Sequence, residues 1–354
     1  MKIVSIVGAR PQFIKLGPLS RELREFHSEL IIHTGQHFDS EMSDLFFRDL
    51  EIPKPTYNLN ISGGTHGQQT SQMLSSIETV LLKESPGLVI VFGDTNSTLA
   101  GSLAASKLCI PCLHIEAGLR SFNRTMPEEI NRIVADHTSN FLFVPTETAM
   151  VNLDKEGLLS KSYLTGDIMV DSLAWGLNKS KGSTFIESLN LDKKPFSLLT
   201  LHRPYNVDDP DKLITIINKL GSLNTHIVFP VHPRTKSIIE KNNIKIPSNF
   251  QLIKPVGYLD FIKLQTSSVR IITDSGGIQK EAFLLHKPCI TLRPETEWLE
   301  TVNEGWNILL DVSNPNLIET IESFSPSSLP SHVFGTDVAK KMVSIINTKI
   351  LSYI

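Results

Sequence analysis

The chain has 354 residues, which at about 150 residues per domain predicts two domains, and its 40% hydrophobic and 20% charged residues are typical of a globular protein. Its 34 Lys and Arg residues nearly balance 37 Asp and Glu residues, and a formal charge of -3 gives no reason to expect binding to nucleic acid or to a membrane surface. No apolar run approaches the roughly 18 residues that cross a bilayer, and the opening Lys2–Gly8 reads as a strand rather than a signal peptide.

Short apolar runs alternate with helix-length segments along the whole chain, which is typical of parallel strands covered on both faces. The expected strands are Lys2–Val7, Leu30–His33, Leu88–Phe92, Cys112–Ile115, Phe141–Val144, Ser162–Leu164, Phe196–Thr200, Ile227–Phe229, Phe250–Ile253, Val269–Thr273, Cys289–Leu292 and Asn307–Leu310. The expected helices are Gln12–Arg24, Gln68–Lys83, Ser97–Lys107, Glu128–His137, Pro210–Leu220, Gly277–Leu285 and Leu317–Phe324.

The alternation resets once, between Asp167 and Lys194, where the helical stretch Ile168–Trp175 precedes the polar run Asn178–Ser183. We therefore predict two doubly wound α/β domains, 1–168 and 169–336, that face each other across a cleft. A final helix within 337–354 is expected to pack back toward the first domain. Ligands of such sheets bind at the carboxyl ends of the strands.

Charged residues and glycines collect at these strand ends. The segments concerned are Gly8–Pro11, Gly93–Ser97, Glu116–Arg120, His202–Arg203, His232–Arg234 and Asp274–Gly277. One charged loop residue is readily explained by solvent exposure, but six such segments at the same edge of two sheets indicate a functional site. Asp94 and Glu116, with Glu128 and Glu129 nearby, are candidates for acid/base chemistry, although Pro127–Glu129 is also an ordinary helix opening.

Two groups of residues suit a diphosphate. Asp274–Glu281 reads as strand, glycine turn and helix, whose first N–H groups bind phosphate, while Glu281 would bind ribose hydroxyls. The alternative is a helix capped by Asp274 or Ser275. Arg10 and Lys15 near a helix start oppose the helix dipole, which disfavours a purely structural role and suits a diphosphate, with plain surface exposure as the alternative. No G-x-G-x-x-G motif follows the first strand and no P-loop is present.

Cys109 and Cys112 form a C-x-x-C pair that follows a helix and leads into a strand, the reverse of a thioredoxin-like site. We expect both to be buried core thiols, and no further ligands present themselves for zinc.

The chain resembles the non-hydrolysing UDP-N-acetylglucosamine 2-epimerases in six stretches that follow the family's order. They are Gly8–Lys15 (GARPQFIK), His33–His37 (HTGQH), Gly93–Leu99 (GDTNSTL), His114–Arg120 (HIEAGLR), Pro127–Arg132 (PEEINR) and Thr273–Glu281 (TDSGGIQKE). The resemblance implies a glycosyltransferase-B-like pair of Rossmann-like domains with the active site in the interdomain cleft. It further implies a cytoplasmic homodimer that uses no organic cofactor or metal.

The family inverts C2 of a UDP-2-acetamido sugar by eliminating UDP to a 2-acetamidoglucal and adding it back, which supplies precursors of surface polysaccharides. By position, the resemblance makes Asp94, Glu116 and Glu128 the acid/base carboxylates and places His202 near the diphosphate and sugar. The substrate-binding residues that it implies are Arg10, Lys15 and His232 for phosphate or nucleotide, Ser275, Gly276 and Gly277 for the diphosphate, Glu281 for ribose and Phe261 for uracil.

The resemblance leaves open which UDP-sugar is the substrate. Members specific for UDP-N-acetylglucosamine usually have Arg-Pro-Glu-Ala, His-Arg-Arg-Glu and Thr-Glu-Arg-Pro where this chain has Arg10–Phe13, His202–Tyr205 and Thr296–Leu299. Pro204 replaces an arginine that binds an activating second substrate in many bacterial members, so the resemblance does not imply that activation here. The stretches Arg10–Lys15, Gly63–Gly67, Met126–Ile130 and Glu297–Trp298 look more like a sister group that epimerises UDP-2,3-diacetamido-2,3-dideoxyglucuronate. The competing functions are a glycosyltransferase of the same fold, a hydrolysing epimerase, and a UDP-sugar-binding protein without catalysis.

Overall fold

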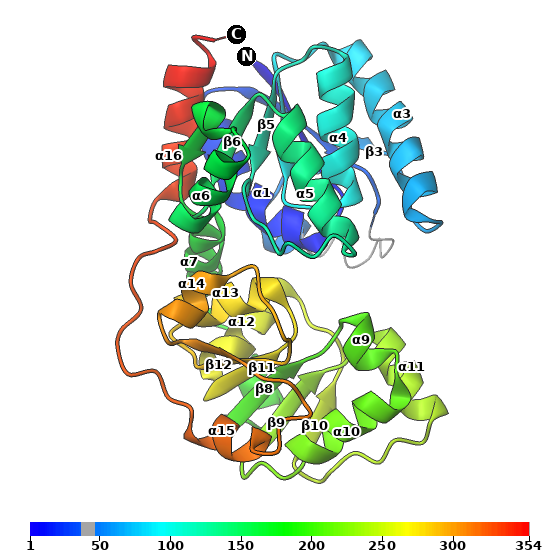
Figure 1. The fold of residues 1–354 in the computed structure, drawn as a ribbon, viewed down its shortest axis with the longest axis vertical. Helices are drawn as coiled ribbons and strands as arrows, with labels where there is room; N and C mark the ends of the chain where they lie inside the picture. The colour runs from blue at the N-terminus through cyan, green and yellow to red at the C-terminus, as the bar shows by residue number, and fades with distance from the viewer. Residues whose placement is uncertain (37–46, 354) are drawn as a thin grey trace. The chain divides into compact units, whose positions relative to one another are not determined.

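The structure, a computed structural model, describes residues 1–36 and 47–353, and Figure 1 shows it as a ribbon. The chain divides into two compact units. Unit 1 comprises Met1–Ala174 and His332–Ile354, and unit 2 comprises Trp175–Ser331. Helix α7 (Met169–Ser180) carries the chain from unit 1 into unit 2. Each unit contains its own sheet, so the predicted α/β class with two doubly wound parallel sheets is confirmed.

Unit 1 contains a seven-stranded parallel sheet in the order β3-β2-β1-β4-β5-β6-β7. Its strands are β1 (Lys2–Val7), β2 (Ser28–His33), β3 (Tyr57–Asn58), β4 (Leu88–Phe92), β5 (Cys112–Ile115), β6 (Phe141–Val144) and β7 (Ser162–Leu164). Its helices are α1 (Arg10–Leu23), α3 (His66–Glu84), α4 (Asn96–Lys107), α5 (Pro127–Thr138), α6 (Glu147–Lys155) and α16 (Val338–Ile345), with short turns η1 (Leu159–Lys161) and η2 (Ile346–Ile350). Helix α4 packs against α3 and α5, and α16 returns at the end of the chain to pack against α1.

Unit 2 contains a six-stranded parallel sheet in the order β10-β9-β8-β11-β12-β13. Its strands are β8 (Phe196–Thr200), β9 (His226–Pro230), β10 (Phe250–Ile253), β11 (Arg270–Thr273), β12 (Cys289–Thr291) and β13 (Asn307–Leu309). Its helices are α8 (Phe185–Ser188), α9 (Pro204–Val207), α10 (Pro210–Leu220), α11 (Pro233–Lys241), α12 (Tyr258–Ser267), α13 (Gly276–Leu284), α14 (Leu299–Asn303) and α15 (Leu317–Ser323).

Burial explains why the strands were predictable. Every residue of β4 is buried, as the continuous apolar run Leu88–Phe92 requires when helices cover both faces. The edge strand β3 is only partly buried, and α11 buries just Thr235 and Ile239, so neither leaves a clear apolar pattern. Among the described residues, no helix is both long and apolar enough to cross a membrane.

The cysteine pair differs from the expectation in one member. Cys112 is buried in β5, where desolvation raises the pKa of its thiol to about 12, so it is an inert core residue. Cys109 is exposed, and the expectation of a second core thiol is wrong. The reason is local: Cys109 adopts a left-handed backbone (φ 54°) directly after α4 ends, in the turn that reverses the chain before β5. Both thiols are free.

Candidate functional site

In unit 1, the loop after β1 is held tightly against its neighbours. A Cβ at Gly8 would lie 2.0 Å from Thr34 Oγ1 and 2.2 Å from Ser97 Oγ, so no other residue fits this position. The buried Gln12 accepts hydrogen bonds from the Gly8 and Ala9 N–H groups at 2.7 and 3.0 Å, which fixes the start of α1. The backbone of Arg10, which is partly exposed in the first turn of this helix, is therefore held in place.

Glu116 lies directly after β5 and forms an ion pair with Lys15 of α1. Both side chains are only 9% exposed, and Glu116 adopts a left-handed backbone with φ 72°. This conformation is rare for a residue with a side chain and is concentrated at functional sites. A Cβ at Gly93 would lie 3.1 Å from both Glu116 Oε2 and Lys15 Nζ. The structure thus brings together the ends of β4 and β5 and the start of α1.

Asp94, the next residue after Gly93, is held by Arg132 of α5. Arg132 donates from Nε and Nη2 to Asp94 Oδ2 at 3.1 and 2.6 Å, and from Nη1 to Glu129 at 2.8 Å. Glu129 is buried and accepts the N–H groups of Ser121 and Phe122, both at 2.9 Å, so it fixes the loop between β5 and α5. Of the adjacent acidic residues, Glu129 is therefore structural, while Glu128 is partly exposed in the first turn of α5.

A buried charge network that the sequence analysis missed supports these strand ends. His114 is hydrogen-bonded through Nδ1 to Asp136 and through Nε2 to the Gly93 carbonyl, both at 2.7 Å. Arg120 binds the other oxygen of Asp136 at 2.8 Å and also pairs with Glu156. The carbonyl next to Asp94 is thereby anchored. The seven-residue stretch His114–Arg120 contains both of these partners of Asp136, but nothing in the sequence links them to α5.

This network predicts loss of stability in acid. Burial opposes the charge of Asp136, but the hydrogen bonds and charges of His114 and Arg120 outweigh it and lower the pKa of this carboxyl. A carboxyl with a lower pKa in the folded state binds fewer protons when folded, so its stabilising effect is largely complete above the unfolded pKa of about 3.9. The effect shrinks as the pH falls below that value and is lost as the pH passes through the lower folded pKa. We expect the melting temperature to fall steadily below about pH 5. A melting temperature that is flat from pH 6 to pH 3 would contradict this assignment.

In unit 2, the predicted phosphate loop lies between β11 and α13. Ser275 is the residue before the helix and makes no side-chain cap in the described structure. Asp274, which is fully buried, does not cap α13 either. Its carboxylate accepts instead the N–H groups of His202 and Arg203 at 3.1 Å and lies 2.8 Å from His202 Nδ1. The capping alternative for this segment is therefore wrong, and the loop connects His202 to the first turn of α13.

The two glycines of the loop have different surroundings. A Cβ at Gly276 would lie 2.2 Å from Glu297 Oε1, so this glycine is required by packing. A Cβ at Gly277 would have no described atom within 4 Å, so the protein itself does not require a glycine there. A glycine without a packing reason is what the close approach of a ligand to the backbone would need.

The remaining predicted residues of unit 2 lie on α13, on α12 and directly before α11. Glu281, one turn into α13, is 5% exposed and accepts a hydrogen bond from Gln265 at 2.7 Å. Phe261 lies on α12, partly buried against the core. His232 precedes α11 and accepts the Arg234 N–H at 3.3 Å. His37, part of one of the six matching stretches, lies outside the described residues.

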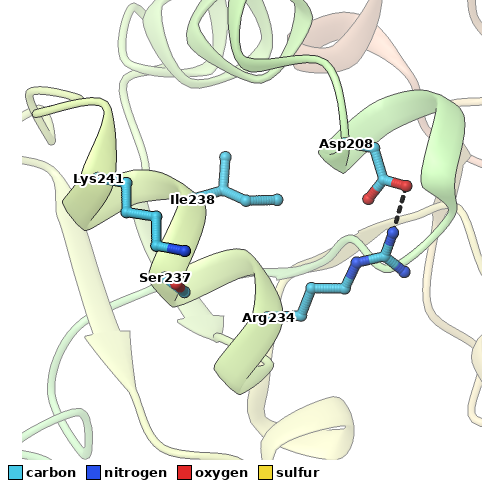
Figure 2. Close-up of a pocket in the computed structure, with 5 residues that line it drawn as sticks. All are labelled: Asp208, Arg234, Ser237, Ile238 and Lys241. Carbon is cyan, nitrogen blue, oxygen red and sulfur yellow. Dashed lines mark hydrogen bonds and ion pairs between the residues drawn. The ribbon is translucent and has the colours of Figure 1, made fainter.

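A pocket beside α11 contains Arg234 from one of the charged strand-end segments, but none of the catalytic or substrate-binding residues that the resemblance implies. Figure 2 shows its lining, Asp208, Arg234, Ser237, Ile238 and Lys241, with Arg234 turned toward Asp208 in an ion pair. Both partners of that pair are more than one-third exposed, so the pair itself contributes little to stability. Within residues 1–36 and 47–353, no group of three or more His, Cys, Asp or Glu side chains is arranged to hold a metal ion.

Comparisons with known proteins identify the family of this chain. The sequence pattern of UDP-N-acetylglucosamine 2-epimerase matches residues 21–346. A UDP-N-acetylglucosamine 2-epimerase homolog of Methanococcus maripaludis is 55% identical over 93% of this chain and 94% of that protein. The UDP-2,3-diacetamido-2,3-dideoxy-D-glucuronate 2-epimerase of Pseudomonas aeruginosa is 49% identical over 90% and 91% of the two chains. A crystal structure of the Methanocaldococcus jannaschii UDP-GlcNAc 2-epimerase in complex with UDP-GlcNAc and UDP matches all of both chains with 43% identity and a TM-score of 0.91. The chain therefore belongs to the UDP-N-acetylglucosamine 2-epimerase family of isomerases.

Proposed function

We propose that this protein inverts C2 of a UDP-2-acetamido sugar without hydrolysing it. The observation that carries the proposal is the pair of carboxylates, Asp94 and Glu116, that adjacent parallel strands present at the same edge of the sheet. Each is held next to a cation, Arg132 or Lys15. Acid/base groups need this kind of fixed geometry, because a proton is transferred only over hydrogen-bond distance.

The chemistry explains why several carboxylates are needed. The C2 proton of the sugar is not next to a carbonyl group, so its direct removal is very slow. In the proposed reaction a base takes the C2 proton, the C–H electron pair forms the C1–C2 double bond, and the C1–O bond breaks with its electrons leaving on UDP. Addition of UDP at C1 and of a proton to the other face of C2 completes the inversion. We propose Asp94, Glu116 and Glu128 as the proton carriers.

Unit 2 supplies the proposed UDP-binding residues. We infer that the backbone of Ser275–Gly277 binds the diphosphate at the start of α13, where N–H groups and the helix dipole favour an anion. Glu281 would bind the ribose, Phe261 the uracil, and His202 the region where diphosphate and sugar join. Arg10, Lys15 and His232 are proposed as further phosphate or nucleotide contacts. The relative crystallised with UDP-GlcNAc and UDP supports a UDP-sugar as the ligand.

Gly277→Ala tests the diphosphate site. The added methyl group meets no described atom of the protein, so the melting temperature should stay near that of the wild type. If the diphosphate approaches this backbone, the methyl group costs about 1–3 kcal/mol of binding free energy, roughly a tenfold to hundredfold loss of UDP affinity in calorimetry. Gly276→Ala is the contrasting variant, because its methyl group collides with Glu297 and should lower the melting temperature. Unchanged UDP affinity in Gly277→Ala would mean that the diphosphate does not bind against this backbone.

Two UDP-sugars are the proposed substrates, UDP-N-acetylglucosamine and UDP-2,3-diacetamido-2,3-dideoxyglucuronate. Relatives named for each are similar to this chain at 46% and 49% identity. A side-by-side assay of the purified protein with both sugars decides between them. We further propose that the enzyme acts as a cytoplasmic homodimer in the synthesis of surface-polysaccharide precursors. Measurement of the molecular mass in solution tests the oligomeric state.

A further inference from the structure

The contacts of Asp274 concentrate on the His202 segment. The carboxylate is fully buried and accepts the backbone N–H groups of His202 and Arg203 and the side-chain amide of Asn206 at 3.1 Å. Asn206 also donates to the Leu292 carbonyl at 3.2 Å, which ties this arrangement to the segment after β12. Three contacts of one buried carboxylate with a single short segment are more than the path of a loop requires.

The remaining contact selects one imidazole nitrogen. His202 Nδ1 lies 2.8 Å from Asp274 Oδ1, and an ionised carboxylate only accepts hydrogen bonds, so Nδ1 carries the hydrogen. The hydrogen bonds of His202, Asn206 and Arg203 lower the pKa of Asp274 against the opposing effect of burial, which keeps this carboxyl ionised. The His202 side chain remains 50% exposed while Asp274 is 0% exposed, so the ring is anchored on its buried side and open to a ligand on the other.

We propose that Asp274 is a positioning residue that holds His202 as the Nδ1–H tautomer and reserves Nε2 for the UDP-sugar. The inference rests on the proposed function for the identity of the ligand. In the neutral ring Nε2 is an acceptor, and in the protonated ring it becomes a donor to a phosphate oxygen. Without the buried carboxylate, the ring would divide between two tautomers and its orientation would no longer be fixed.

The test measures the tautomer directly. Protein labelled with [15N]histidine gives long-range proton–nitrogen spectra, and His202→Asn assigns the His202 signals. The expected result is a protonated Nδ1 in the wild type, with an Nε2 signal that moves when UDP alone is added. Asp274→Asn should lose the tautomer preference and most of the UDP-induced shift, and should lower kcat roughly tenfold or more with a smaller change in KM.

Asn206→Ala separates this role from support of the loop. It removes a hydrogen bond to the same carboxylate but leaves the charge and the Nδ1 contact in place. We expect it to lower the melting temperature while His202 keeps the Nδ1–H tautomer. A neutral wild-type ring that carries its proton on Nε2 and not on Nδ1, or the same tautomer and kcat in Asp274→Asn as in the wild type, would overturn the inference. Failure of the proposed function would show separately, as an absence of exchange at C2 of the sugar, because the tautomer and the UDP shift need no turnover.

Discussion

Asp94→Asn and Glu116→Gln should each lower the turnover of the UDP-sugar roughly a hundredfold or more, because each removes a proton carrier while keeping the size of the side chain. Asp94→Asn keeps a partner for Arg132 at the end of β4, and Glu116→Gln keeps one for Lys15. UDP affinity should change far less than turnover, because most of the proposed UDP contacts lie in unit 2 and both variants leave Arg10 and Lys15 in place. Steady-state rates and calorimetric UDP binding provide the two measurements.

Glu147→Gln is the matched control for these variants. Glu147 is an exposed carboxylate of unit 1 in the first turn of α6, where it takes no part in the proposed site. Its neutralisation should leave turnover close to the wild type. Near wild-type turnover in Asp94→Asn or Glu116→Gln would remove that residue from the mechanism, whatever the control does.

Asp136→Ala should lower the unfolding free energy by about 3–5 kcal/mol. Asp136 is fully buried between His114 and Arg120, so its loss leaves buried positive charge without its main partner. The effect should appear as an earlier midpoint in urea-induced unfolding. It should also reduce turnover at temperatures where the variant is folded, since the network anchors the carbonyl next to Asp94.

Glu156→Gln tests whether the expected loss of stability in Asp136→Ala is due to the burial of the aspartate. Glu156 binds the same Arg120 side chain at 2.7 Å, but its own side chain is 26% exposed, so water replaces part of the lost interaction. We expect a cost of about 1 kcal/mol or less. Equal losses in Glu156→Gln and Asp136→Ala would mean that burial of the aspartate is not what makes the network important.

The fold was largely predictable because its strands are short, apolar and buried on both faces. Each strand predicted from the sequence is present, and β1, β4 and β5 have the predicted ends. Helices with few buried residues were missed, as α11 shows, because an amphipathic stripe is the main signal of a helix. Helix α12 was missed although Tyr258, Ile262 and Leu264 are buried. Phe261, which was singled out by the resemblance, therefore lies on a helix that the sequence analysis did not predict.

The sequence predicted which strand ends carry the site residues, but not the contacts between their side chains. Parallel strands bring their carboxyl ends to one edge, so Asp94 and Glu116 were expected near each other. The pairing of Lys15 with Glu116 joins residues 101 positions apart, and no local pattern encodes it. Asp274 is the clearest case: its position before a helix favours a cap, but its side chain turns back to His202, 72 positions earlier. Such contacts depend on the order of strands in the sheet, which a single sequence does not state.

Incorporation of deuterium tests the central claim most directly. The purified protein is incubated in deuterated water with each of the two UDP-sugars, and the product is examined by proton and phosphorus NMR. The account predicts deuterium at C2 of the sugar, formation of the C2 epimer, and no accumulation of UDP in step with turnover. A sugar that is converted without deuterium at C2, or UDP released in proportion to product, would contradict a non-hydrolysing C2 epimerase.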